Sequence, residues 1–387
     1  MIAPPWLPVP PNGYGGIENV IHSLVPELIR LGVEVELFAP GDSKLKSVRL
    51  NYAYEDSQYK HILRPQYETG PISTGHILHA VNRILEAGNF DIIHDHNNYL
   101  GPLVFAHAAE ALPPVIHTLH NPGFVKSEAE AEQPEAGVMW RELAKAKNLY
   151  FVGLSKAMQR SAPNAIRHLL LKPVYNAVSL RDFPFREKKS NYFITLGSFK
   201  PEKGADIAVR ACIATGSKLK MAGVVNNLVS RSQVMLELAN PSSRYRTYTD
   251  FRYFSDSIMP HLYDNNIEYV GNVRGPEKMR FIGKARALLF PIQWEEPFGM
   301  AVIEALACGT PVIAMNRGAM PELIIHGKTG FLAKDEAEFK RYMTEVDKLN
   351  PADCRESVAE KFSAGTMASK YLERYREAIV LSRASKK

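Results

Sequence analysis

The sequence has little cysteine and no long apolar run, and these absences exclude several classes of protein. Three cysteines in 387 residues are too few and too scattered for a disulfide framework or a zinc site. No apolar run approaches the roughly 18 residues that span a bilayer, so we predict no integral membrane segment. The first residues lack a basic segment followed by an apolar core, and five prolines within residues 4–11 are incompatible with a signal helix. We therefore expect a cytoplasmic protein.

The length and the charge of the chain indicate a two-domain globular protein. At 387 residues the chain exceeds one ordinary core, which predicts two domains of about 180 residues each. The net charge is +6, and it is unevenly placed. Residues 1–180 hold 15 Lys and Arg against 17 Asp and Glu, whereas residues 181–387 hold 32 against 24. The basic excess belongs to the C-terminal half, where solvated lysines account for most of it.

Short apolar runs alternate with amphipathic helical patterns, which predicts an α/β fold with mainly parallel sheets. In the first half we expect strands at 33–39, 91–94, 115–119, 149–154 and 174–178, and helices at 17–31, 72–87, 103–111 and 137–146. Ser155 is expected to cap the next helix. Residues 180–190 lose the periodicity and gain charge, so we place an interdomain linker there.

The second half repeats the pattern with one interruption. We expect strands at 192–196, 218–222, 267–270, 287–290 and 312–314, helices at 205–215, 228–239, 276–285 and 300–307, and a helical tail at 351–383. Residues 241–250 are aromatic and basic but have no period. Such a run can bind single-stranded nucleic acid. Because no fold signal supports that function, we interpret the run as a surface loop and predict no nucleic-acid partner.

The segment 295–315 carries the strongest functional signal. Pro297 and Gly299 interrupt the chain, and Met300 then begins a helix of small apolar residues with one carboxylate, Glu304. An unpaired charge in such surroundings costs several kcal/mol, so Glu304 must face a partner or a polar ligand. The start of the helix offers free amides and a positive dipole end for an anionic or hydroxyl-rich ligand. Glu296, in the preceding loop, can point at the same spot.

This segment resembles the donor-sugar signature of the retaining glycosyltransferases of family 4. The matching features are Glu296-x7-Glu304, the Phe298-Gly299 pair between them, and the Ala-Cys-Gly-Thr-Pro-Val run that follows. The resemblance covers nearly the whole chain and implies the GT-B architecture: two Rossmann-like domains with parallel sheets facing across a cleft, and a last helix that crosses back. It implies an N-terminal acceptor-binding domain at 1–180, a linker at 181–190, a nucleotide-sugar-binding domain at 191–360 and the returning helix at 361–387.

The same resemblance identifies two glycine-rich elements as phosphate contacts. Gly15 and Gly16 match a loop that reaches the nucleotide diphosphate in the family. Residues 197–204 look like the Gly-Arg-x-x-x-Glu-Lys-Gly element, in which Lys203 supplies a positive charge for the leaving diphosphate. The family's arginine is replaced here by Ser198, and Lys200 is the candidate to take over its charge without the two-pronged geometry of an arginine.

Three histidines are expected at strand ends. His94 and His96 have a spacing that can bind a metal, but Asp95 is the only carboxylate nearby and no Asp-x-Asp motif is present, so we predict no metal site. His120 matches the family histidine that contacts the donor sugar. The alternative for His120 is an ordinary hydrogen-bonded loop histidine.

The resemblance implies transfer of a hexose from a nucleotide-diphosphate sugar to an acceptor hydroxyl, without a metal or other cofactor and with the leaving phosphate accepting the acceptor's proton. The catalytic candidates are Glu296, His120 and Lys203. The donor-binding candidates are Gly15, Gly16, Ser198, Lys200, Lys203, Glu296, Pro297, Phe298, Gly299, Met300 and Glu304. UDP-glucose is the first candidate donor. The acceptor, whether a sugar, a lipid-linked sugar or a small molecule, and the oligomeric state stay open.

Other activities remain as alternatives at this point. A sugar-nucleotide epimerase or a phosphorylase can share the architecture, although a phosphorylase needs a phosphate or pyridoxal site for which no lysine motif is evident. A two-domain sugar-binding protein would be expected to carry an export signal. A dinucleotide-dependent dehydrogenase is disfavoured because residues 13–18 fail the Gly-x-Gly-x-x-Gly spacing.

Overall fold

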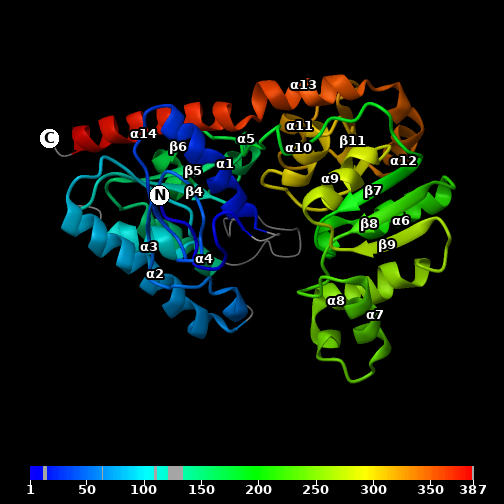
Figure 1. Cartoon of the computed structure of the whole chain (residues 1–387), viewed down its shortest axis with the longest axis horizontal. Coiled ribbons are helices and arrows are strands. Elements are labelled where there is room, and N and C mark those ends of the chain that lie inside the picture. Colours follow the sequence, from blue (N-terminus) through cyan, green and yellow to red (C-terminus); the bar gives the residue numbers. More distant parts are fainter. Residues whose placement is uncertain (12–14, 63, 109–110, 121–133, 386–387) are drawn as a thin grey trace. The chain divides into compact units, whose positions relative to one another are not determined.

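The chain folds into two compact units, shown in the computed structural model of Figure 1. The structure describes residues 1–11, 15–62, 64–108, 111–120 and 134–385. Unit 1 comprises the described residues up to Ala177 together with the C-terminal segment from Ser363, and unit 2 comprises Val178–Phe362. Both units are α/β, and every pairing between their strands is parallel.

Unit 1 is built on a parallel sheet in the order β3-β4-β5-β6. Its strands are β3 (Ile93–Asp95), β4 (Val115–Leu119), β5 (Leu149–Gly153) and β6 (Leu170–Leu171). Two further strands, β1 (Glu36–Phe38) and β2 (Arg49–Asn51), pair with each other. Ile2 makes parallel bridges to both Phe38 and Asp95 and is fully buried. The segment around Ile2 therefore fills the position of a first strand between β1 and β3.

The helices of unit 1 come from both ends of the chain. They are α1 (Gly16–Arg30), α2 (Gln66–Ala87), α3 (Leu100–Ala108), α4 (Pro134–Leu143), α5 (Lys156–Arg160) and α14 (Ala364–Ser385). Ser155 caps α5 as expected, because its side chain accepts a hydrogen bond from the amide of Met158. Helix α14 packs along α1, and its Tyr371 and Tyr375 are buried in the same apolar cluster as Leu24 of α1.

Unit 2 contains a six-stranded parallel sheet in the order β12-β11-β10-β7-β8-β9. Its strands are β7 (Tyr192–Leu196), β8 (Lys218–Ala222), β9 (Ile267–Gly271), β10 (Leu288–Phe290), β11 (Val312–Met315) and β12 (Gly330–Ala333). The strand order reverses between β7 and β10. In open α/β sheets, ligands bind outside the carboxyl ends of the strands at such a reversal.

The helices of unit 2 include the segment that carries the signature. They are α6 (Ala205–Ala214), α7 (Arg231–Ala239), α8 (Thr249–Tyr253), α9 (Gly275–Lys284), α10 (Met300–Ala307), α11 (Met320–Leu323), α12 (Glu336–Glu345) and α13 (Pro351–Lys361). Helix α10 has the predicted bounds, as do the strands at 115–119, 192–196 and 218–222. These segments are short and bounded by glycine, proline or polar residues, and all but the lysine-containing strand at 218–222 are mainly apolar, so their ends can be predicted from the sequence.

One sequence expectation is wrong, and a second is only partly met. The strand expected at 174–178 does not form, and the chain pairs with β5 earlier, through Leu170 and Leu171. The amide of Val174 still donates to the carbonyl of Gly153 in β5 at 3.0 Å, but no strand forms beyond Leu171 in this described segment. The segment 241–250 lies mostly at the surface, as expected, but it is not an irregular loop: it contains a 3-10 turn, Arg244–Thr247, anchored by Tyr245, which is 8% exposed, and it enters α8. These turns are too short to show a helical period.

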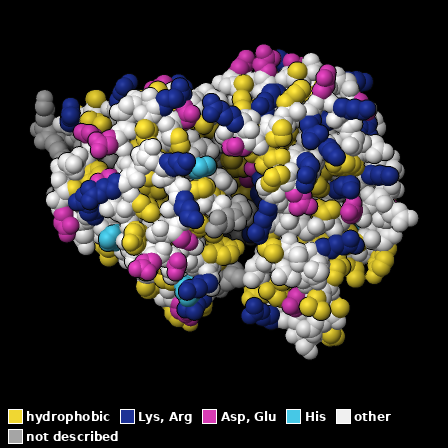
Figure 2. All heavy atoms as spheres, viewed as in Figure 1, with side chains coloured by type: hydrophobic (Ala, Val, Ile, Leu, Met, Phe, Trp, Pro, Cys, Tyr) yellow, Lys and Arg dark blue, Asp and Glu magenta, His cyan; other side chains and the backbone are white. Residues whose placement is uncertain are grey.

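The face of the molecule drawn in Figure 2 carries side chains of both charges. Lys and Arg side chains are interspersed with Asp and Glu over the face drawn in Figure 2. Among the helices that the structure describes, none is both long enough and apolar enough to cross a membrane.

Candidate active site

In unit 2, the chain after β7 meets the chain after β10 at the reversal of the strand order. Gly204 has a φ of +68°, and a Cβ there would lie 2.1 Å from the carbonyl oxygen of Pro291. Only glycine combines this left-handed conformation with such a close approach. The amide of Gln293 donates to the carbonyl of Glu202 at 2.8 Å, which ties the two segments together. Lys203 is thereby held beside the loop that leads to α10.

Glu296 is held in that loop by two side-chain donors. Its Oε2 accepts hydrogen bonds from Nζ of Lys203 at 2.5 Å and from Nε1 of Trp294 at 2.8 Å. The Lys203 ammonium also lies 4.9 Å from the centre of the Trp294 ring. The Glu296 side chain is only 12% exposed. The loop 317–322 supports this arrangement, because the amide of Ala319 donates to the Glu296 carbonyl at 2.9 Å.

Glu304 also has a cationic partner, as its apolar surroundings require. Its Oε1 accepts a hydrogen bond from Nζ of Lys278 at 2.7 Å, and the Glu304 side chain is 13% exposed. The sequence predicted that this carboxylate must be paired, but it did not identify Lys278 of α9. Both signature carboxylates are thus mostly buried, and each is neutralised by a lysine.

The N-terminus of α10 lies directly after the Glu296 loop. Gly299 caps the helix with a φ of +102°, and a Cβ there would lie 2.9 Å from the side-chain methyl of Met320. No side chain in the described part of the chain caps this helix end. Pro297 and Phe298 are buried, and the Phe298 ring packs edge-on against Phe362 at 6.1 Å. Their side chains therefore belong to the core, so a ligand would meet the backbone of this turn and the partly exposed Met300.

Ser198 and Lys200 lie in the connection between β7 and α6, as Lys203 does, but they take no part in the Lys203–Glu296 pair. Ser198 is half-buried, and its carbonyl accepts a hydrogen bond from the amide of Lys200 at 3.1 Å. Nζ of Lys200 lies 3.9 Å from Glu202, and its side chain is 43% exposed. An ion pair of this length on the surface is weak, so Lys200 can be redirected at little cost.

In unit 1, Gly15 precedes α1 and Gly16 is its first residue. Residues 12–14 of the predicted glycine-rich loop lie outside the described residues. Glu18, in the first turn, is 4% exposed, and burial raises the pKa of its carboxyl from 4.5 to about 7. A neutral Glu18 leaves the positive end of the helix dipole uncompensated near neutral pH, which favours an anionic ligand there.

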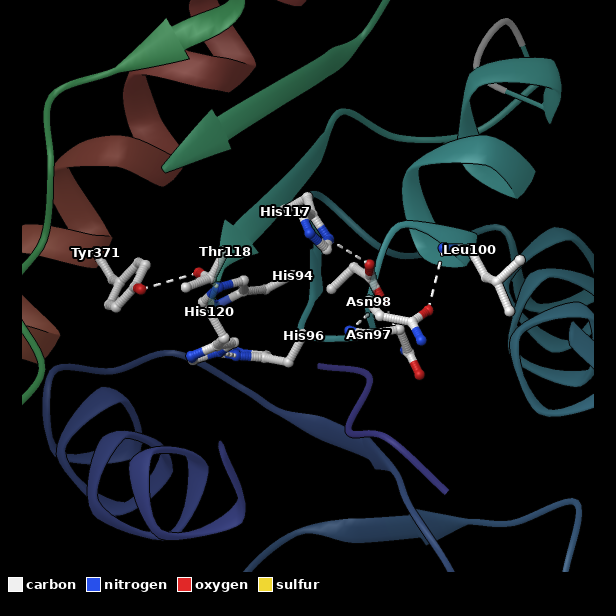
Figure 3. A network of polar contacts seen from close by, with 10 residues as sticks. His94, His96, Asn97, Asn98, Leu100, His117, Thr118, His120 and Tyr371 are labelled. Carbon is white, nitrogen blue, oxygen red and sulfur yellow. Dashed lines mark hydrogen bonds and ion pairs between the residues drawn. The ribbon is translucent and has the colours of Figure 1, made fainter. Parts of the chain in front are cut away.

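His120 follows β4 and is hydrogen bonded to a second histidine (Figure 3). Nδ1 of His96 and Nε2 of His120 are 2.8 Å apart, and their rings stack with centres 5.1 Å apart. Burial lowers the pKa of both rings, that of His120 to about 3. The lowered pKa values keep both histidines neutral near pH 7, so in this contact one ring donates and the other accepts. Nε2 of His96 is buried without a hydrogen-bond partner in the described structure.

His94 differs from the expectation of a strand-end histidine, because it lies within β3 and has both ring nitrogens occupied. Nδ1 contacts the hydroxyl of Tyr375 and Nε2 contacts Oγ1 of Thr118, each at 2.7 Å. Thr118 in turn contacts the Tyr371 hydroxyl at 2.9 Å (Figure 3). His94 therefore anchors α14 to the sheet. Within the described ranges, no three His, Cys, Asp or Glu residues are arranged to hold a metal ion.

Strands β3 and β4 hold a second polar pair, besides His96 and His120, that the sequence did not reveal. Nδ1 of His117 lies 2.6 Å from Oδ2 of Asp95, and the amide side chain of Asn97 donates to Oδ1 of Asp95 at 2.7 Å. His117 and Asp95 occupy facing positions of β4 and β3. Their spacing in the sequence gives no sign of this, because only the strand register brings them together.

Comparisons with known proteins identify the family to which both units belong. Residues 179–360 match the family described as Glycosyl transferases group 1, and residues 14–166 match Glycosyltransferase Family 4. The chain is 22% identical over 343 residues to the D-inositol 3-phosphate glycosyltransferase of Pseudarthrobacter chlorophenolicus, which covers 82% of this chain and 78% of that one.

Two solved structures share the fold along almost the whole chain. Sucrose-phosphate synthase from Thermosynechococcus elongatus has a TM-score of 0.73 at 19% identity, with 98% of each chain covered. Anabaena HepE in complex with UDP-glucose has a TM-score of 0.64 at 18% identity, with 94% of this chain and 96% of that chain covered.

Proposed function

The chain belongs to the family 4 glycosyltransferases, has the GT-B fold and is a sugar-transferring enzyme; we propose that it moves a hexose from a nucleotide-diphosphate sugar to an acceptor hydroxyl with retention of configuration. UDP-glucose is the proposed donor, and no metal takes part. The relative solved with UDP-glucose guides the choice of donor.

One observation carries this proposal: Glu296 and Glu304 are both mostly buried, and each is paired with a lysine, beside the start of α10, which no side chain of the described residues caps. Carboxylates accept hydrogen bonds from sugar hydroxyls, while lysines and helix N-termini attract phosphate. A nucleotide sugar carries both kinds of group. In unit 2 the two carboxylates therefore suit the hydroxyl groups of such a ligand, and the lysines and the helix start suit its diphosphate.

We assign the donor contacts accordingly. Glu304 accepts hydrogen bonds from the ribose hydroxyls. Glu296 and the backbone amides at Phe298 and Gly299 hold the hydroxyls of the transferred sugar. Lys203 binds the diphosphate, with Lys200 redirected from Glu202 toward it and Ser198 beside them.

The contribution of unit 1 rests on three residues. Gly15 and Gly16 offer the start of α1 to the diphosphate, where Glu18 is close to neutral. His120, held by His96, contacts the transferred sugar. Because burial keeps both histidines neutral, His120 serves as a hydrogen-bonding group and not as a cation.

The reaction then proceeds on one face of the sugar. The bond between the anomeric carbon and the leaving phosphate oxygen breaks, and the acceptor oxygen bonds to the anomeric carbon from the same side. The acceptor's proton passes to the departing phosphate oxygen, so no protein base is needed. Lys203 stabilises the negative charge that develops on the diphosphate.

We propose a cytoplasmic location, because the three cysteines are free and buried, as is usual in a reducing compartment.

The proposal is tested by measuring nucleotide release from several nucleotide sugars, with and without candidate acceptors, in the presence of a chelator. We expect acceptor-dependent release of one nucleotide. Release without any acceptor would instead support an epimerase or hydrolase, and no release from any donor would contradict the proposal.

A further inference from the structure

Unit 1 contains a cavity of about 200 Å³ that has no part in the donor contacts assigned above. It lies between the start of α2, the chain that follows β3, and the segment after Ile2. Its lining includes Trp6, Arg64, Thr69, Gly70, Ser73, Asn98 and Tyr99. Since two of these segments leave the carboxyl ends of neighbouring strand positions, the cavity lies at the edge of the sheet where α/β proteins bind ligands.

The size of the cavity suits a single ring. An apolar cavity of about 150 Å³ holds a benzene molecule, whereas pockets that bury whole drug-sized ligands measure roughly 300–1,000 Å³. A volume of about 200 Å³ therefore accommodates one six-membered ring with its substituents. A longer ligand would have to extend beyond the cavity.

The lining is that of a site for a polyhydroxylated ring. Trp6 and Tyr99 provide aromatic surfaces, and both are partly buried. Ser73, which is 3% exposed, and Thr69 provide hydroxyl groups. Asn98 uses its Oδ1 to cap α3, accepting from the amide of Leu100 at 3.1 Å, so its amide hydrogens remain for a ligand.

The charge of the lining indicates an anionic substituent. Arg64 is the only charged side chain among the described residues that line the cavity. Its pairing with Glu68 is long, at 3.6 Å, and both side chains are substantially exposed. Such a pair contributes little, so Arg64 can turn to a ligand carboxylate or phosphate and bind it with two parallel hydrogen bonds.

The cavity adjoins the histidine network through a shared segment. His96, directly after β3, contacts His120, and Asn98 follows two residues later in the same connection (Figure 3). Asn98 also lines the cavity. A ring bound there lies at the same sheet edge as the histidine to which we assign a donor-sugar contact.

We propose that this cavity binds the acceptor, and that the acceptor is a six-membered polyol ring carrying a carboxylate or a phosphate group. This inference rests on the proposed transferase function. Trp6 and Tyr99 contact the ring, Ser73, Thr69 and Asn98 bind its hydroxyls, and Arg64 binds the anionic group.

The test uses the full chain and measures binding of glucuronate, glucose 6-phosphate and glucose by ligand-observed NMR, without donor. Gly70→Leu is the blocking variant, because a Cβ at Gly70 meets no atom within 4 Å and leucine favours a helix interior. Arg64→Gln removes the cation. Arg30→Gln is its matched control, since Arg30 is an exposed arginine of unit 1 that pairs with Glu27.

We expect the wild type to bind at least one of the two anionic probes at least tenfold more tightly than glucose. The stronger anionic probe identifies the carboxylate or the phosphate. Arg64→Gln should remove this preference, Gly70→Leu should weaken every probe at least tenfold, and Arg30→Gln should change nothing. Equal binding of glucose and both anions, or unchanged binding by Gly70→Leu, would overturn the inference.

Donor binding separates this inference from the proposed function. Gly70→Leu should bind UDP-glucose as the wild type does, because Gly70 makes no donor contact in our assignment. If the wild type bound the anionic probe but no nucleotide sugar, the transferase proposal would fail while the cavity remained a ligand site. If it bound UDP-glucose but none of the probes, only the acceptor assignment would fail.

Discussion

Nζ of Lys203 lies 2.5 Å from Oε2 of Glu296, so the cation assigned to the leaving diphosphate also neutralises the carboxylate assigned to the sugar. The two side chains are 27% and 12% exposed. Because they come from segments 93 residues apart, the contact depends on the folded connection between β7 and β10. Donor binding and local stability are therefore coupled at this pair.

We predict that Lys203→Met destabilises the protein and weakens donor binding together. Glu296 would keep the Trp294 indole as a partner but lose its counter-charge, which should cost about 1–3 kcal/mol in free energy of unfolding. Denaturant titration and donor calorimetry measure the two effects. Lys220→Met is the matched control, since Lys220 pairs with Glu268 at 2.9 Å where both side chains are more than a third exposed. It should cost less than about 1 kcal/mol and leave donor binding intact; equal effects in both variants would contradict this prediction.

Glu18→Gln should stabilise the protein at high pH. Burial raises the pKa of Glu18 from 4.5 to about 7, so the folded state binds more protons than the unfolded state between these values. The contribution of Glu18 is therefore present below pH 4.5 and is lost as the pH rises through 7. The neutral amide should gain up to about 3 kcal/mol over the wild type at pH 8 and nothing at pH 4. Thermal unfolding at both pH values is the measurement, and a gain that is the same at both would refute the assignment.

His94 should give the opposite pH dependence. Burial lowers its pKa well below 6.5, so the unfolded state binds more protons as the pH falls below 6.5. The stability that depends on neutral His94 is present above 6.5 and is lost below it, at up to about 1.4 kcal/mol per pH unit. His94→Gln should reduce this slope between pH 6.5 and 4.5, although it lowers stability at pH 7.5 by disturbing the bonds to Thr118 and Tyr375. An unchanged slope would show that His94 does not control acid unfolding.

Elements whose ends are marked by nearby glycine or proline and whose interior is apolar were predictable from the sequence. Helix α10 is bounded by Gly299 and by the chain reversal at Gly309, and its single acid had to be paired, as the contact with Lys278 confirms. The identity of the partner was not predictable, because Arg280 and Lys284 lie on the same helix α9. Only the three-dimensional packing of α9 against α10 selects Lys278.

Contacts between distant segments account for most of what the sequence did not show. His94 meets Tyr375 across 281 residues, and nothing in the spacing of either residue indicates that contact. The strand expected at 174–178 was misplaced because β-favouring composition alone does not show where pairing with β5 begins and ends; it runs through Leu170 and Leu171, with one further contact from the amide of Val174 to the carbonyl of Gly153. The cavity beside Trp6 was also missed, because its walls come from three separate segments.

The central claim is that Glu304 and Glu296 bind one nucleotide-sugar donor, and calorimetric titration of Glu304→Ala with UDP-glucose tests it most directly. Glu268→Ala, which removes a surface carboxylate of unit 2, is the control. We predict at least a tenfold loss of donor affinity for Glu304→Ala, with cooperative unfolding retained and wild-type affinity in the control. Donor affinity equal to that of the wild type in Glu304→Ala would contradict the account.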